Sequence, residues 1–167
     1  KDGVIALSGK GAGLLLSKEE YASFELEWEW KLAEGGNNGL KYWVTKVGGK
    51  EWLGIEYQMI DDFKHPDALK GANRTTGSIY DLKDPAKDKV LKPVGEWNTE
   101  EITCKGKQVT IVLNGETIVD TDIEKASTPK TIDGKDHPGL KREKGFICFC
   151  GHGAKVDFRN LRVKELK

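Results

Sequence analysis

Ionisable side chains gather in one stretch of the chain, residues 54–67. Apolar residues at positions 55, 57 and 59 alternate with polar residues that include Glu56 and Gln58, a pattern typical of a strand with one apolar and one polar face. Pro66 ends regular pairing, and the residues around it can transfer protons or bind a cation: Asp61, Asp62, Lys64, His65 and Asp67. The alternative is an edge strand that runs into a solvated loop.

The most regular alternation in the chain, residues 24–32, predicts a β-strand. Five apolar side chains at even positions share one face, and Glu25, Glu27 and Glu29 share the other. A helix would scatter both sets around its axis. The glutamate face is expected either to meet solvent or to line a polar cleft.

Glycine and asparagine mark the turns between the predicted strands. Residues 35–39 predict a hairpin turn, because Gly and Asn tolerate positive φ. Residues 40–47 form the partner strand, on which Lys41 and Trp43 are expected to share one face, opposite Tyr42. Asn114-Gly115 predicts the clearest hairpin, between residues 109–113 and 117–120.

The rest of the chain also favours β-structure. No segment of ten or more residues has a strong helical period, and residues 123–144 are polar enough to predict a surface excursion with one helical turn. Residues 145–152 and 156–166 predict the closing strands. Many short strands at turn spacing are typical of an all-β protein, a sandwich or jelly roll of antiparallel sheets.

Composition excludes several classes of protein. The 167 residues suffice for one domain, and 27 basic residues balance 27 acidic ones. A general nucleic-acid binder or anionic-membrane binder would need a basic excess. No apolar run is long enough to span a bilayer. The three cysteines cannot all pair internally, and Cys148 and Cys150 lie two apart on one strand, a poor geometry for a disulfide.

Motifs along nearly the whole chain resemble the 3-keto-disaccharide hydrolase family, also described as 3-keto-glucoside 1,2-lyase/hydratase domains. The matching pieces occur in the family's order: YASFELEWEWKL (21–32), GGNNGLKYWV (35–44), GIEYQMIDDFKHPD (54–67), GSIYDL (77–82), GEWNT (95–99), LNG (113–115), and GHG with FRNLRVKEL (151–166). The resemblance implies a single domain over residues 1–167 with a concanavalin A-like jelly roll, a sandwich of two antiparallel sheets. Two departures stand out: Cys150-Gly151 replaces the usual Gln-Asp, and Asn38 replaces the usual Ser.

The resemblance also implies a chemistry. A ketone at sugar C3 acidifies the hydrogen on C2, and its removal gives an enolate that can expel the C1 substituent. Water then adds back, so the net reaction is glycoside hydrolysis. Such a reaction needs a base near C2, a cation or donor for the enolate oxygen and an acid for the leaving group. It needs no NAD or other organic cofactor, although a sugar 3-dehydrogenase must first make the ketone.

Several residues suit these roles. Glu56 is a candidate base, and Lys41, His65 and His152 are candidate donors or proton carriers. Alternation places Glu56 with Gln58, and His152 with Cys148 and Cys150. If these strands are neighbours, as the resemblance to a lectin-like sandwich implies, Glu56 and His152 can both point into one concave cleft. The candidates for substrate contact are Gln58, Asn37, Asp61, Asp62, Arg74, Tyr80, Trp43 and Trp97.

A divalent metal ion is a further expectation, with Glu56, Asp61, His65 and His152 as ligands, since carboxylate and imidazole suit several such ions. Other interpretations stay open for some of these residues. His152 between glycines fits a structural turn, and His65 before Pro66 fits a loop cap. Trp43 and Trp97 fit core packing as well as sugar stacking.

Two functional classes compete on this scaffold: an enzyme on 3-keto-glycosides, and a non-catalytic, lectin-like carbohydrate-binding module. The density of titrating groups favours the enzyme. The resemblance suggests export to the periplasm or cell surface, with a targeting segment removed.

Overall fold

The computed structural model describes residues 3–9, 13–49 and 51–167 of the chain, and almost all of its regular structure is β-strand. The strands are β1 (Ile5–Ser8), β2 (Leu14–Leu16), β3 (Phe24–Leu32), β4 (Asn37–Val47), β5 (Glu51–Ile60), β6 (Asn98–Lys105), β7 (Gln108–Leu113), β8 (Glu116–Asp122), β9 (Phe146–Gly151) and β10 (Lys155–Glu165). The helical segments are one turn each: η1 (Ala68–Lys70), η2 (Ala72–Arg74), α1 (Ile123–Ala126) and η3 (Pro138–Lys141). None of them could cross a membrane.

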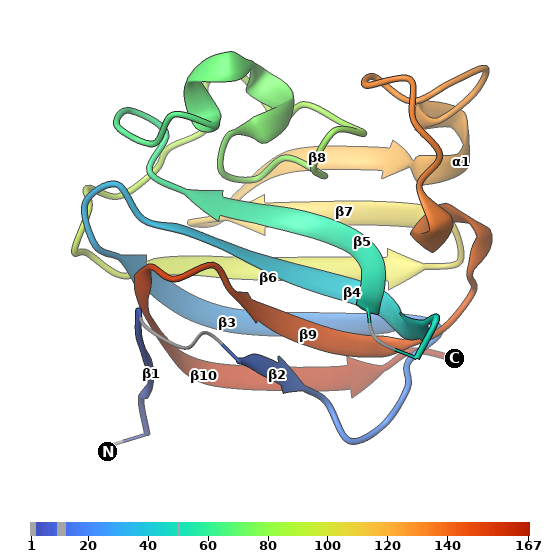
Figure 1. The fold of residues 1–167 in the computed structure, drawn as a ribbon, viewed down its shortest axis with the longest axis horizontal. Helices are drawn as coiled ribbons and strands as arrows, with labels where there is room; N and C mark the ends of the chain where they lie inside the picture. Colours follow the sequence, from blue (N-terminus) through green and yellow to red (C-terminus); the bar gives the residue numbers. More distant parts are fainter. Residues whose placement is uncertain (1–2, 10–12, 50) are drawn as a thin grey trace.

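The strands form two antiparallel sheets packed face to face (Figure 1). One sheet has six strands in the order β1-β10-β3-β6-β7-β8, and the other has four in the order β2-β9-β4-β5. This confirms the predicted all-β jelly-roll sandwich of two antiparallel sheets. The expected helical turn within residues 123–144 is present as α1, accompanied by η3.

The core lies between the sheets, where the predicted alternation places it. Phe24, Leu26, Trp28 and Trp30 of β3 are all buried, and their partners across the core come from the alternate positions of the four-stranded sheet: Leu40, Tyr42, Ile55, Tyr57, Met59, Ile147 and Phe149. Aromatic rings meet edge to face, with the Trp28 and Tyr57 centroids 5.6 Å apart. Burial of this apolar surface is the main force that holds the two layers together.

A β-bulge in β4 overturns one expectation. The register of β4 shifts between Tyr42 and Thr45 against β5 and between Lys41 and Val44 against β9, and Trp43 has a positive φ of 49°. Tyr42 and Trp43 therefore both point into the core, and the indole Nε1 of Trp43 donates to the carbonyl oxygen of Ala22 at 2.9 Å. The prediction that Trp43 shares a face with Lys41 was wrong, because an extra residue in one strand reverses the alternation after it.

Two turn predictions also have mixed outcomes. The Asn114-Gly115 hairpin is confirmed, with both residues at positive φ between β7 and β8. The first hairpin turns earlier than expected, at residues 33–36, so Asn37, Asn38 and Gly39 belong to β4. Residues 77–81 form no strand and contribute only isolated bridges, between Ile79 and both Tyr57 and Lys83.

One carboxyl group is buried inside the sandwich. Glu100 on β6 points inward, and the indole Nε1 of Trp30 donates to its Oε2 at 3.1 Å. Burial raises the pKa of Glu100 to about 8. The side chain is therefore largely neutral at pH 7, which reduces the cost of keeping it in the core.

The pKa of Glu100 predicts how stability depends on pH. The folded protein keeps this proton up to about pH 8, whereas an unfolded chain releases it near the ordinary glutamate pKa of about 4.3. The folded state binds more protons between these values, so this group makes the free energy of unfolding fall by a few kcal/mol as pH rises from about 4.5 to 8. Glu100→Gln should flatten that decline in denaturant titrations between pH 5 and 8. Glu101→Gln, on the opposite face of the same strand, should leave it as in the wild type, and equal slopes in all three proteins would contradict the assignment.

Candidate active site

The outer face of the four-stranded sheet collects the polar residues that the sequence pointed to. β4 lies between β5 and β9 (Figure 1). Lys41 of β4 is directly opposite Glu56 of β5 on one side and Cys148 of β9 on the other. Directly opposed residues of antiparallel strands point to the same side of a sheet, so these three side chains form one row across its outer face.

Glu56 is shared between an ammonium group and an imidazole. Its Oε2 lies 3.4 Å from Lys41 Nζ, and its Oε1 lies 3.3 Å from Nε2 of His152, which follows β9 directly. The side chains of Glu56, Lys41 and His152 are 18%, 21% and 38% exposed, so the cluster is shielded from bulk water but open to a ligand. Partial shielding makes these charge interactions stronger than those of exposed pairs.

Glu56 changes the pKa values of Lys41 and His152. The hydrogen bond to Glu56 raises the pKa of His152 above its usual value of 6.5. Burial, the largest single effect, lowers the pKa of Lys41, but attraction to Glu56 and interactions with Cys150 and Cys148 together outweigh it and raise that pKa. Lys41 is therefore charged at neutral pH, and a larger fraction of His152 is protonated than in a free imidazole.

Two thiols lie beside this cluster, on the same face of the sheet. The sulfur atoms of Cys148 and Cys150 are 3.9 Å apart, and both residues are buried with Val44 under Leu16, Trp52 and Phe146. The hydrogen bond to Cys148 and burial raise the pKa of Cys150, so it is a neutral thiol at pH 7. Alternation in the sequence predicted that both cysteines share a face with His152. It did not predict that they lie next to Lys41 and Gly39.

The acidic residues that follow β5 serve the loop instead of the site. Asp61 is buried and accepts hydrogen bonds from the backbone N–H groups of Gly35, Phe63 and Lys64 at 2.8–3.2 Å. Asp62 accepts from the N–H of Thr76 and pairs with Lys89 at 2.9 Å. Both carboxylates are thereby committed to holding the loop in shape.

His65 also has a local role. Its Nδ1 accepts the backbone N–H of Asp67 at 3.1 Å, as expected of a loop cap. The structure thus brings Glu56, Lys41 and His152 together, whereas Asp61, Asp62 and His65 are bonded to other partners away from this cluster.

The predicted metal ligands do not assemble. Across residues 3–9, 13–49 and 51–167, no group of three or more His, Cys, Asp or Glu side chains is placed to hold a metal ion. Of the expected set, only Glu56 and His152 touch. The ammonium group of Lys41 lies 3.4 Å from the same carboxylate, where it would repel a cation. The residues present therefore do not fit a divalent ion at Glu56.

Arg74 and Tyr80 belong to an ion-pair network that covers the edge of β5. Arg74 pairs with Asp67 at 2.8 Å and with Asp81 at 3.0 Å, and the hydroxyl of Tyr80 donates to Asp67 at 2.8 Å. Although burial opposes it, hydrogen bonds from Lys70, Tyr80 and Arg74 lower the pKa of Asp67 to about 2. The backbone N–H of Tyr80 donates to the carbonyl oxygen of Glu56 at 2.8 Å, so the network fixes the strand that carries Glu56.

Two amide side chains retain unused hydrogen-bonding capacity. Gln58 lies two residues after Glu56 and is buried, and within the described part of the chain its Oε1 has no hydrogen-bond partner. Asn37 Oδ1, at the start of β4, is also a buried atom without a hydrogen-bond partner among the described residues. Buried polar atoms normally have partners, so a water molecule or a ligand hydroxyl is expected at these atoms.

Trp97 lies away from this face. On the outer side of the six-stranded sheet, the charged groups of Lys31 and Arg159 lie 4.8 and 4.1 Å from its ring centroid. Neither Trp97 nor the buried Trp43 offers a free ring beside Glu56, so the sugar-stacking alternative is not supported for either residue.

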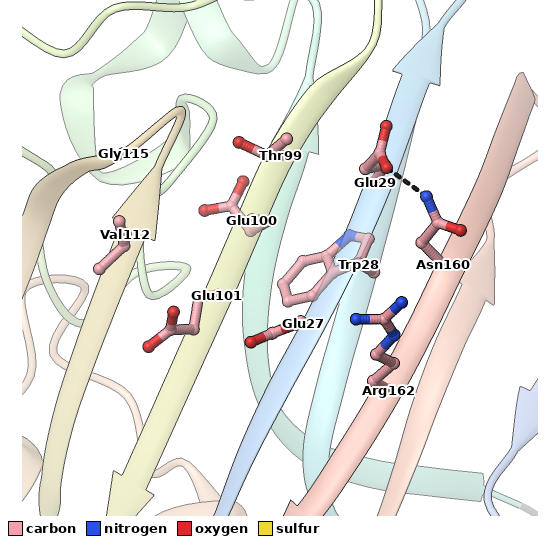
Figure 2. A pocket seen from close by; sticks show the side chains of 10 residues that line it. All are labelled: Glu27, Trp28, Glu29, Thr99, Glu100, Glu101, Val112, Gly115, Asn160 and Arg162. Atoms are coloured by element: carbon pink, nitrogen blue, oxygen red, sulfur yellow. Dashed lines mark hydrogen bonds between the residues drawn. The ribbon is translucent and has the colours of Figure 1, made fainter.

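A hollow of about 400 Å³ on the six-stranded sheet is the other candidate site (Figure 2). The predicted glutamate face of β3 lines it, with Glu27 opposite Glu101 of β6. Glu29 at its edge is bound by Arg159 and Asn160. Trp28 and Glu100 point into the core. This hollow has no counterpart to a carboxylate shared by an ammonium and an imidazole, and we therefore favour the face that carries Glu56.

Comparison with known proteins identifies a family that covers almost the whole chain. The family described as the 3-keto-alpha-glucoside-1,2-lyase-like domain matches residues 1–164. A 3-keto-disaccharide hydrolase of Bacteroides thetaiotaomicron is 33% identical over 201 aligned residues, covering 99% of this chain and 69% of that protein.

Solved structures show the same fold. A Parabacteroides distasonis protein, provisionally designated a glycosyl hydrolase, is 31% identical with a TM-score of 0.84, over 99% of this chain and 88% of that one. The carbohydrate-binding module CBM66 of Bacillus subtilis matches 98% of this chain and 96% of its own, with a TM-score of 0.57 and 12% identity. At that identity the likeness shows the fold alone.

The shared carboxylate makes a prediction about His152. NMR titration should give its imidazole a pKa above 6.5, and Glu56→Gln should lower that pKa because the charged acceptor is gone. Glu101→Gln on the other sheet is the matched control and should leave it unchanged. An imidazole pKa that is insensitive to Glu56→Gln would show that the contact does not persist in solution.

Proposed function

The chain belongs to the 3-keto-alpha-glucoside-1,2-lyase-like domain family, and from that premise we propose that it cleaves 3-keto-glycosides with Glu56 as the base. Membership makes it an enzyme of the hydrolase and lyase type. The observation that carries the assignment of the site is the single carboxylate of Glu56, held 3.4 Å from an ammonium and 3.3 Å from an imidazole on one sheet face.

The proposed reaction begins with removal of the proton on sugar C2. The ketone at C3 acidifies this hydrogen, and Glu56 accepts it while the electron pair moves onto the C3 oxygen. The resulting enolate re-forms the ketone as the C1–oxygen bond breaks, which leaves a C1–C2 double bond. The departing oxygen takes a proton from His152. Water then adds at C1 and C2 regains a proton, so the net result is hydrolysis.

The charges around Glu56 suit the two remaining roles. Lys41 is held in its charged form, and it can stabilise the negative charge that develops on the enolate oxygen. The raised pKa of His152 keeps a proton available for the leaving group near neutral pH. A carboxylate next to an ammonium and a protonated imidazole is a weaker base than a free one. The same two groups, however, stabilise the enolate that forms when Glu56 takes the C2 proton.

A conventional glycosidase would need a second carboxylate. The two groups would lie about 5–5.5 Å apart in a retaining enzyme and about 6.5–9.5 Å apart in an inverting one. The acidic residues that follow Glu56 in the chain, Asp61 and Asp62, are bonded to backbone N–H groups and to Lys89. Elimination requires only one base with a nearby cation, which is the arrangement present.

Gln58 and Asn37 are the best-supported substrate contacts. Each offers a buried carbonyl oxygen without a partner among the described residues, and a sugar hydroxyl is a suitable donor. Cys150 lies opposite Gly39 on the same face, where its neutral thiol supplies a weaker hydrogen-bonding group than an amide would.

The substrate implies a preceding reaction. A 3-keto-sugar must be formed by an oxidoreductase that removes hydride from C3, so we propose that a sugar 3-dehydrogenase supplies this enzyme. We also propose that the protein acts in the periplasm or at the cell surface. Fractionation of the source cells with an antibody would test the location, and full-length protein found only in cytosol would argue against it.

Glu56→Gln tests the proposed base. The variant should lose about 10²–10⁴-fold in kcat on a 3-keto-glucoside, because general-base transfer contributes that much, and wild-type turnover in D₂O should place deuterium at C2 of the product. Glu101→Gln should retain full activity, and the unoxidised parent glucoside should stay intact. Cleavage of the parent glucoside, or product without deuterium at C2, would rule out elimination through C2.

A further inference from the structure

The side chain of Glu56 crosses a neighbouring strand to reach His152. Glu56 lies on β5, His152 follows β9, and β4 runs between them (Figure 1). Lys41 is level with Glu56, but His152 lies beyond the pair formed by Asn38 and Gly151. The carboxylate must therefore extend diagonally over β4, and the residue on the way that shares this outer face is Gly39.

The space above Gly39 is filled by Glu56 itself. A Cβ added at Gly39 would lie 2.9 Å from Glu56 Cδ and 3.1 Å from Glu56 Cγ, and nearer still to Oε1. These separations are shorter than van der Waals contact between carbon atoms, which is about 3.5–4.0 Å. Any other residue at position 39 would compete with the carboxylate for the same place.

The backbone does not require glycine at this position. Gly39 pairs regularly with Gln58 and Cys150 inside β4 and is not among the residues with positive φ. An L-residue can adopt that extended conformation. A glycine inside a strand weakens it unless something approaches closely, and here the side chain of Glu56 makes that approach.

We infer that Gly39 is a positioning residue: its missing side chain lets the Glu56 carboxylate lie across β4, where Lys41 and His152 share it. Only the catalytic consequence of this inference rests on the proposed function. The atoms displaced by a Cβ are the far end of a flexible side chain, so Gly39→Ala should move the carboxylate and leave the sheet intact. The contact with His152 should be lost first, because Lys41 lies in the same row as Glu56 and remains within reach.

The primary test measures the pKa of His152 by NMR and needs no substrate. Gly39→Ala should lower this pKa toward the ordinary value of about 6.5, by as much as Glu56→Ala does. Combining the two substitutions should lower it no further, because nothing then remains to be displaced. Gly13→Ala is the matched control, since its added Cβ meets no atom of the described residues within 4 Å, and it should not change the pKa.

Activity gives a second measurement. On a 3-keto-glucoside, Gly39→Ala should reduce kcat by about 10²-fold, as a displacement of roughly 1 Å at a reacting group can, with little further loss in the Glu56→Ala background. If the wild type turns over no 3-keto-glycoside, the proposed function fails. The His152 pKa values of the single and double variants would still decide the role of Gly39.

Four results decide between these outcomes. An unchanged His152 pKa in Gly39→Ala, or an equal drop in the presence and absence of the Glu56 side chain, would overturn the inference. Unfolding of Gly39→Ala in both backgrounds would overturn it as well, because the backbone would then need the glycine. Unfolding of the single variant that Glu56→Ala rescues would support the close contact.

Discussion

The arrangement depends on the register in which β4 pairs with its two neighbours. Because side chains alternate with a period of two, a slip of one residue would turn Lys41 into the core and Leu40 outward. The apolar face prevents that slip: Leu40, Tyr42, Ile55 and Tyr57 are completely or almost completely buried against the tryptophans of β3. The charged row on the outside is thus held by hydrophobic burial on the inside.

The bulge at Trp43 divides β4 into two functional parts. Before it, alternation places Lys41 and Gly39 on the outer face. After it, Val44 turns outward and joins Cys148 and Cys150 in an apolar cluster. Close packing defines this corner, since a Cβ at Gly145 would meet the backbone of Trp43 at 2.7 Å or less. The polar site therefore has an apolar border on its own sheet face.

The sequence predicted what alternation and turn chemistry determine. Residues 24–32 and the Asn114-Gly115 hairpin were correct because one periodic pattern settled each. Glu56 and His152 were placed on one face for the same reason. The hydrogen bonds of Asp61 and His65 could not be predicted, because their partners are backbone N–H groups that come close only in the folded chain, and no side-chain pattern reveals them. Trp43 was misjudged because a bulge inserts one residue without a sequence mark, and the path of Glu56 over Gly39 depends on three strands at once.

The backbone bonds that residues 77–80 make to β5 have a consequence for solubility. The N–H of Gln58 donates to Ser78, and the carbonyl groups of Gln58 and Glu56 accept from Gly77 and Tyr80, at 2.8–3.1 Å. An edge strand with free N–H and C=O groups is a template on which another chain can pair and aggregate. At Glu56 and Gln58 that edge is already paired within the molecule. Residues 77–80, which hold the part of β5 that carries Glu56, therefore also prevent a strand of another molecule from pairing with the sheet there.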